Sequence, residues 1–192
     1  MVSLPRFKYM HALSDMRVGG IDVGTKNFAF VCLEFDEKKR NESPVLVDAS
    51  LTDFGEGSIS EIITRFHSKF CHVRIDALCV EQQSPIAHRN FALAHALVGW
   101  AVSRGVRVCF GTARTKFDYF GRLLDVPVSM SYAQRKAYAV SLMQVLCETY
   151  GLDLSEFDNK KQDDIADALI YALNYAIELR VISKPGVVCW DI

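Results

Sequence analysis

The 192-residue sequence lacks the features that place a protein in a membrane or hold a small secreted domain together. No apolar run approaches the ~20 residues that a membrane-spanning helix needs. Its six cysteines form no C-x-x-C pair, and the five histidines show no zinc-type spacing next to them. Neither a disulfide framework nor a zinc site is therefore expected. The N-terminus also lacks the hydrophobic core of a secretory signal, so we expect an intracellular protein with reduced thiols and no membrane partner.

An excess of charge is missing too, because 22 Lys and Arg balance 23 Asp and Glu for a formal net charge of −1. This balance does not by itself indicate nucleic-acid binding. An acidic centre can offset the charge of a basic rim in the total, so the distribution of charge along the chain matters more than its sum. Internal repeats and low-complexity runs are absent as well. The length suits one domain, and we expect residues 1–16 to form a flexible leader and 17–192 a single domain.

Apolar periodicity predicts the order of elements along the chain. Five segments have the alternation or the continuous apolar character of strands: 17–23, 27–35, 45–54, 75–81 and 106–110. Four segments have helical spacing or helix-capping residues: 58–70, 86–104, 131–150 and 161–180. The order predicts an α/β protein with the RNase H-like fold. Its mixed five-stranded sheet has an antiparallel three-strand meander followed by parallel strands, flanked by helices.

Acidic side chains occur at three places where folding alone does not favour them. Asp22 lies within the first strand and Glu81 ends the fourth, where an unpaired carboxylate beside buried residues is costly without a cation or a donor. Asp163, Asp164 and Asp167 open the last helix, although the helix dipole would also favour acids there. The i, i+3 and i, i+4 spacings leave open whether Asp163 or Asp164 shares the inward face with Asp167.

If the first and fourth strands are neighbours, these carboxylates meet at one edge of the sheet. Clustered carboxylates repel one another, and divalent cations relieve the repulsion. Mg²⁺ prefers oxygen ligands, and paired ions ~3.5–4 Å apart stabilise the attacking and leaving oxygens of a phosphoryl displacement. We therefore expect two Mg²⁺ ions, for which Mn²⁺ can substitute.

Three segments together resemble the RuvC-like Holliday junction resolvases, most of all the branch with the poxvirus and fungal mitochondrial enzymes: GIDVGTKNFAFVCLE, CVEQQ and KKQDDIADALIYAL. The resemblance implies that the metal ligands are Asp22, Glu81, Asp164 and Asp167, with Asp163 less favoured. It implies a homodimer that cuts four-way DNA junctions by symmetric nicks with 5′-phosphate and 3′-hydroxyl ends. The expected location is then the cytoplasm or a viral replication site, with the mitochondrial matrix as second choice.

Basic residues near these motifs suggest where DNA is bound. Arg135 and Lys136 stand in the first turn of a helix, where cations oppose the dipole unless a phosphate binds there. By the resemblance, Lys136 lies near the scissile phosphate and is catalytic. Contacts with the DNA backbone are expected from Lys26, Arg114, Lys116, Arg122, Arg135, Lys160 and Lys161. Core packing is favoured over base stacking for the aromatics Phe117, Tyr119 and Phe120.

Three alternatives share part of the pattern. The D-x-G-T-x-N turn also opens actin, hexokinase and chaperone ATPases, but these need two lobes, and no second phosphate loop or adenosine motif is found. The second is another RNase H-like nuclease, acting on RNA or on flap or branched DNA; a small bacterial RuvC-like relative that processes RNA shares GIDVGTK but is shorter and lacks the late KKQDDIAD cluster. An inert nucleic-acid-binding domain on this scaffold would be expected to lose an acid, and none is lost. A departure from the bacterial resolvases is that no aromatic follows Glu81 in the run Gln82–Pro85.

Overall fold

The structure, a computed structural model, describes residues 15–36, 43–113, 115–117, 119–120, 130–157 and 161–182. Within them the strands are β1 (Asp15–Asp22), β2 (Phe28–Asp36), β3 (Val45–Thr52), β4 (Ala77–Glu81) and β5 (Arg107–Gly111). The helices are α1 (Ile59–Phe70), α2 (His88–Ser103), α3 (Tyr132–Tyr150) and α4 (Gln162–Glu178), with the 3-10 turn η1 (Thr115–Phe117). Most of the predicted leader, residues 1–14, lies outside the described residues.

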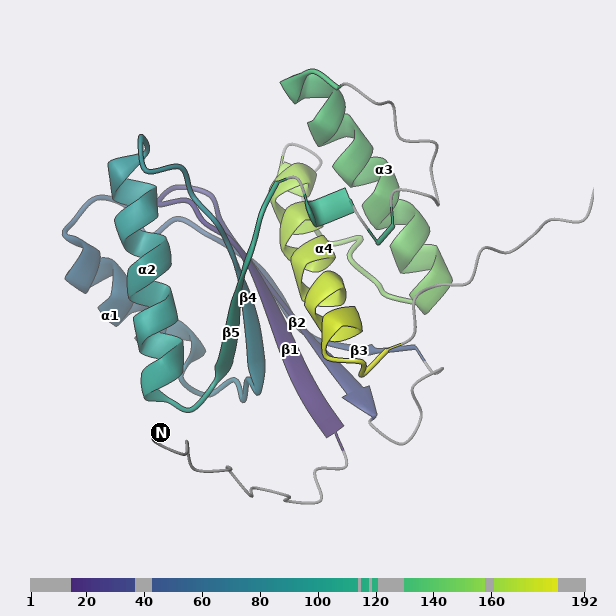
Figure 1. Ribbon diagram of the computed structural model, residues 1–192, viewed down its shortest axis with the longest axis horizontal. Helices are drawn as coiled ribbons and strands as arrows, with labels where there is room; N and C mark the ends of the chain where they lie inside the picture. Colours follow the sequence, from purple (N-terminus) through teal and green to yellow (C-terminus); the bar gives the residue numbers. More distant parts are fainter. Residues whose placement is uncertain are drawn as a thin grey trace, which may run out of the picture.

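The strands form one mixed sheet in the order β3-β2-β1-β4-β5 (Figure 1). β2 pairs antiparallel with both β1 and β3, whereas β4 is parallel to β1 and to β5. The predicted meander followed by parallel strands is confirmed. Because Ile21 of β1 pairs with Val80 of β4, the next residue of each strand, Asp22 and Glu81, ends its strand at the same edge of the sheet.

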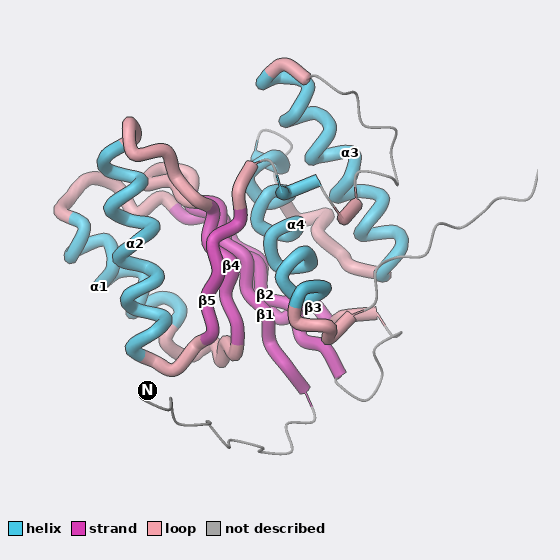
Figure 2. Tube along the Cα trace, viewed as in Figure 1, coloured by secondary structure: helices cyan, strands magenta, loops and turns pink. Residues whose placement is uncertain are grey.

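Helices cover both faces of the sheet, with α1 and α2 on one side and α3 and α4 on the other (Figure 2). Successive side chains of a strand point to opposite faces, and the two cores follow this rule. In β1, Met16 and Val18 pack on the α3/α4 side, whereas Ile21 packs on the α1/α2 side. Asp22 has the parity of Met16 and Val18, which directs its side chain towards α4.

Local signals for the helix ends agree with the structure. Ser58 caps α1 and Ser131 caps α3, each in a capping box with the residue three positions on. Gly151 ends α3 in the left-handed conformation that glycine adopts readily. β1 begins at Asp15, two residues before the predicted domain boundary, because Met16 is a buried core residue. No helix in the described part of the chain is long and apolar enough to cross a membrane.

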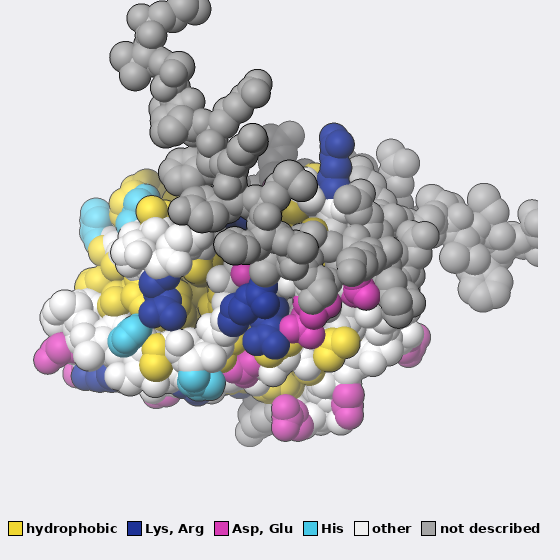
Figure 3. Space-filling view, turned by 90° about the horizontal axis from the view of Figure 1, so that it is seen from below, with side chains coloured by type: hydrophobic (Ala, Val, Ile, Leu, Met, Phe, Trp, Pro, Cys, Tyr) yellow, Lys and Arg dark blue, Asp and Glu magenta, His cyan; other side chains and the backbone are white. Residues whose placement is uncertain are grey.

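The edge of the sheet where β1 and β4 begin carries matched charges. Arg17 pairs with Glu34 at 2.6 Å and Arg74 pairs with Asp76 at 3.0 Å. Seen from below, Lys and Arg side chains gather near the middle of the molecule with Asp and Glu side chains beside them (Figure 3). These pairings contrast with the opposite edge, where β1 and β4 end in carboxylates.

The close packing of α4 on β1 depends on Gly20. A Cβ atom at Gly20 would lie 2.0 Å from the carbonyl oxygen of Ala168 and 2.6 Å from the amide nitrogen of Ala172, both on α4. We predict that Gly20→Ala destabilises the fold by roughly 3 kcal/mol, because a helix backbone must move. Gly99→Ala on α2 is the matched control. It has open space around it and should stabilise by about 0.5–1 kcal/mol. Urea unfolding of both variants measures the difference, and equal midpoints would contradict the packing account.

Candidate active site

Four carboxylates predicted from the sequence come together in one cavity of about 370 Å³. Asp22 and Glu81 reach it from adjacent parallel strands, and the first turns of α4 bring Asp164 and Asp167 from above the sheet. The remaining lining residues are Val23, Gly24, Asn27, Gln83, Ala113, Lys116, Tyr132, Arg135 and Lys136. The directions of the side chains on β1, on β4 and on α4 thus bring the four carboxylates to the same place.

The structure separates Asp163 from Asp164, which the spacing alone could not do. Asp164 lines the cavity. Asp163 instead accepts a hydrogen bond and ion pair from the Lys136 ammonium on α3. This pairing raises the pKa of Lys136 above its ordinary value. The i, i+3 pair Asp164 and Asp167 is therefore the one that faces the strands.

Crowding of the acids shows in their protonation. Burial raises the pKa of Asp22 well above its ordinary range, and a hydrogen bond with Glu81 and the charges of Glu81, Asp167 and Asp164 add to the shift. Burial raises the pKa of Asp167 to about 6, although Lys116 opposes the change. Burial and the neighbouring Asp163 also raise the pKa of Asp164. Without a cation, these aspartates therefore stay protonated to a higher pH than ordinary aspartates do.

Lys116 lies inside the cavity and not on an outer surface. It is 7% exposed, and its Nζ lies 2.6 Å from Oδ1 of Asp167. Its carbonyl oxygen accepts a 2.9 Å hydrogen bond from the buried Asn174 amide of α4, which fixes η1 against the helix. The buried ammonium of Lys116 is thus the cation that the folded chain itself supplies to the half-buried carboxylate of Asp167.

Other predicted DNA contacts take different positions. Arg135 and Lys136 line the mouth of the cavity from the first turn of α3, and Lys26 is exposed in the turn between β1 and β2. Lys161, which precedes α4, donates a 2.5 Å hydrogen bond to Oδ1 of Asn27. Arg114, Arg122 and Lys160 lie outside the described residues.

The aromatics that follow β5 pack inward where they are described. Phe120 is fully buried, and Phe117 stacks edge-on against Tyr138 of α3 with ring centroids 4.9 Å apart. Tyr119 packs partly buried against the same core. The expectation of core packing for these three side chains is confirmed.

Sequence reasoning missed two residues that contact Glu81. Gln83 donates a 2.5 Å hydrogen bond to Oε2 of Glu81, and the Tyr171 hydroxyl lies 3.4 Å from Oε1. The signal for Tyr171 was its position four residues after Asp167, on the same face of α4. The signal for Gln83 was its place two residues after the acid that ends β4.

The donor set fits divalent cations, with one rearrangement. The carboxylate oxygens are the ligands that Mg²⁺ prefers, and the charged neighbours that raise the pKa of Asp22 are all acids. Yet no three Asp, Glu, His or Cys side chains among the described residues could hold a metal ion as they stand. Binding requires Asp22 to release its proton and Lys116 to release Asp167. Both changes involve side chains alone.

A five-stranded sheet of this order, flanked by helices on both faces, is the RNase H-like fold, and carboxylates stand here at the ends of β1 and β4 and at the start of α4. The chain belongs to the family described as Poxvirus A22 protein, whose model matches residues 16–179. A comparison with curated proteins gives no match.

Solved structures share this fold. The fowlpox virus Holliday junction resolvase is 21% identical, with a TM-score of 0.58 over 85% of this chain and 99% of that one. The RuvC of T. thermophilus in complex with a Holliday junction substrate is 18% identical, with a TM-score of 0.61 over 86% and 96%. The yeast mitochondrial Holliday junction resolvase, Ydc2, is 16% identical, with a TM-score of 0.55 over 86% and 82%.

The raised pKa values predict how the stability of the metal-free protein depends on pH. Asp167 has a pKa of about 6 in the folded chain against an ordinary 3.8, and Asp22 is shifted in the same direction. The folded state therefore binds more protons, so the stability present below pH ~4 is lost as the pH rises through ~6. Asp22→Asn removes one of these acids and should raise the Tm at pH 8, because the folded chain no longer has to ionise a carboxyl group whose folded pKa is raised.

Thermal unfolding in chelator between pH 4 and pH 8 measures this effect. Asp153→Asn is the sign control, because hydrogen bonds from Ser155 lower the pKa of that exposed acid and its loss should not raise the Tm. A lower Tm for Asp22→Asn than for wild type at pH 8 would contradict the assignment.

Proposed function

We propose that this protein is an endonuclease that resolves four-way DNA junctions by paired, symmetric nicks. The observation that carries the proposal is the convergence of Asp22, Glu81, Asp164 and Asp167 in one cavity, in a chain of the Poxvirus A22 protein family. Structures of the same fold, from fowlpox virus and from T. thermophilus, are described with a Holliday junction bound. These support a four-way junction as the substrate.

The four carboxylates would hold two Mg²⁺ ions, with Mn²⁺ as a substitute. Bound there, such ions supply an activated water and neutralise the charge on the leaving 3′ oxygen, which gives 5′-phosphate and 3′-hydroxyl ends. Asp22 and Glu81 hold the sheet side of the site, and Asp164 and Asp167 hold the helix side. The ammonium of Lys116, displaced from Asp167, stays within the same cavity, where it can balance a phosphate.

Basic side chains at the mouth of the cavity suit the DNA backbone. Arg135 and Lys136 flank the acids from the N-terminal part of α3, and a helix N-terminus also favours a phosphate. We place Lys136 nearest the scissile phosphate, because its partner Asp163 adjoins Asp164. Lys26 lies in the turn between β1 and β2, and Lys161 contacts Asn27 of the same turn. The contacts of Arg114, Arg122 and Lys160 with DNA stay predictions.

Paired nicks require two active sites. The described residues contain one cavity with these four acids, so we propose a homodimer that presents one site to each of two opposite strands. The alternative substrates are RNA and flap or other branched DNA. An ATP-binding role is disfavoured because the actin, hexokinase and chaperone ATPases need two lobes, and the sequence shows no second phosphate loop or adenosine motif. We infer that the protein acts inside a cell, in the cytoplasm at a viral replication site or in the mitochondrial matrix.

Cleavage of a synthetic mobile four-way junction tests the proposal. With Mg²⁺, wild-type protein should give nicks at symmetric positions on opposite strands. Asp22→Asn and Glu81→Gln should bind the junction but cut at least ~100-fold more slowly, because even outer partners of metal ligands contribute 10–100-fold. Glu34→Gln, at the opposite edge of the sheet, is the matched control and should cut normally. Equal cutting of duplex DNA or of an RNA–DNA hybrid would show a general nuclease. Normal cleavage rates for both Asp22→Asn and Glu81→Gln would contradict the assignment of the metal site.

A second pair of variants tests the orientation of α4. Asp164→Asn should abolish cleavage to the same extent as Asp22→Asn, because Asp164 faces the strands. Asp163→Asn should reduce the rate less, by about 10-fold, since it loosens Lys136 without removing a metal ligand. Rates measured at saturating Mg²⁺ distinguish the two, and the reverse order would mean that Asp163 is the ligand.

A further inference from the structure

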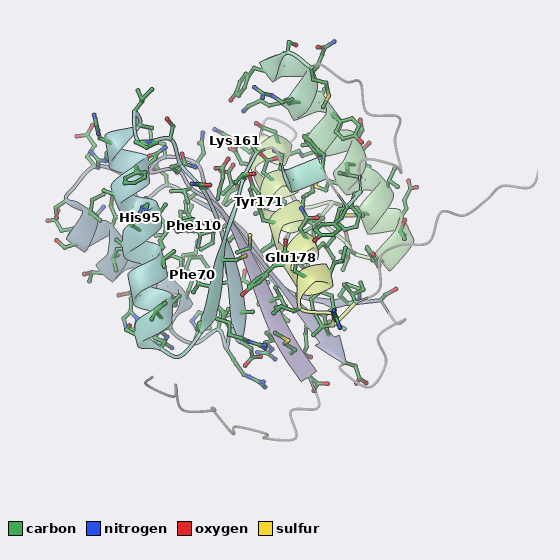
Figure 4. All side chains as sticks on the ribbon, in the orientation of Figure 1. Phe70, His95, Phe110, Lys161, Tyr171 and Glu178 are labelled. Carbon is green, nitrogen blue, oxygen red and sulfur yellow. The ribbon has the colours of Figure 1, made fainter. Side chains whose placement is uncertain are left out.

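Tyr171 reaches the site from beneath the cavity and has no part in the mechanism above. It stands on α4 one turn after Asp167, between the helix and the sheet (Figure 4). Its side chain is 1% exposed, yet its hydroxyl lies 3.4 Å from Oε1 of Glu81. The separation is longer than the usual ~2.7–2.8 Å of an O–H···O bond.

The ring of Tyr171 is fixed by packing against a glycine. A Cβ atom at Gly111, the last residue of β5, would lie 2.5 Å from Cδ1 and 2.7 Å from Cε1 of Tyr171. The ring therefore occupies the space that a side chain on β5 would fill. Gly111 also accepts a 2.7 Å hydrogen bond from the amide of Gln82, the residue after Glu81. Gly111 therefore packs against the ring of Tyr171, which carries the donor hydroxyl, and also binds the backbone next to Glu81, which carries the acceptor.

The two partners of Glu81 differ in rigidity. Gln83 binds Oε2 from the irregular segment that follows β4 and is only partly buried. Tyr171 approaches Oε1 from a helix whose neighbouring residues are buried. The same helix carries Asp164 and Asp167, so a rigid hydrogen bond to Glu81 would fix three of the four carboxylates relative to one another.

We infer that Tyr171 is a positioning residue whose hydroxyl holds the Glu81 carboxylate in the orientation that binds a divalent cation. The inference rests on the proposed metal-dependent function. Hydrogen bonds to metal-ligating side chains fix their orientation, and losing one typically lowers metal affinity 10–100-fold. A hydroxyl that merely fills the core would have no such effect on metal binding.

Tyr171→Phe removes the hydroxyl and keeps the ring, and Tyr175→Phe is the matched control. Tyr175 is also buried, one turn further along α4, and lines the same small cavity as Tyr171, but no hydrogen bond joins it to the four carboxylates among the described residues. Binding of Mn²⁺ alone to the full chain, followed by the paramagnetic signal of free Mn²⁺, is the direct readout. We expect Tyr171→Phe to weaken Mn²⁺ affinity by about 10-fold or more, and Tyr175→Phe to leave it unchanged.

Cleavage kinetics supply the second readout. For Tyr171→Phe, the Mn²⁺ concentration for half-maximal junction cleavage should rise by the same factor, while the rate at saturating Mn²⁺ approaches that of wild type. Wild-type Mn²⁺ affinity in Tyr171→Phe, or an equal loss in both variants, overturns the inference. A wild-type chain that binds Mn²⁺ but leaves junctions uncut overturns the proposed function alone. A wild-type chain that binds no Mn²⁺ overturns both.

Discussion

The parallel pairing of β1 with β4 is the constraint on which the site depends. It brings Asp22 and Glu81 to the same edge of the sheet, on the face that α4 covers. Two more carboxylates arrive from α4, and burial, together with Glu81 and these acids, raises the pKa of Asp22 well above its ordinary range. At the opposite edge of the sheet, Arg17 pairs with Glu34 and Arg74 pairs with Asp76, so this fold can match its charges. Folding alone therefore gives no reason for four acids to lie together. The cations that we propose account for the presence of four acids in one cavity.

Helix α4 joins the stability of the fold to its chemistry. Its close approach to Gly20 sets its height above the sheet, and its small residues Ala168 and Ala172 allow that approach. Along the same face lie Asp164, Asp167, Tyr171 and Asn174, which contact the cavity, Lys116 or Glu81. A shift of the helix would therefore move the acids and their supporting hydrogen bonds together. Lys116 shows how the metal-free chain relieves part of the charge, since it neutralises Asp167 and leaves Asp22 among acids.

Local patterns were enough to predict the elements and the acids that end the strands. Period-two alternation identified the meander, and the presence of an acid beside buried residues marked Asp22 and Glu81. The spacing alone could not decide between Asp163 and Asp164, because the choice depends on Lys136 of α3, 27 residues away; only the family resemblance favoured Asp164. The positions of Lys116 and Tyr171 depend in the same way on partners 51 and 90 residues distant. Such pairings are set by how the helices pack on the sheet, which periodicity does not encode.

The most direct test of the account is a crystal structure with Mn²⁺ bound, in which anomalous scattering locates the ions without assumption. The account predicts two Mn²⁺ ions within the cavity, ligated by oxygens of Asp22, Glu81, Asp164 and Asp167, with Lys116 moved away from Asp167 and Asp163 still on Lys136. Ions held elsewhere, or an unchanged Lys116–Asp167 pair at saturating Mn²⁺, would contradict it.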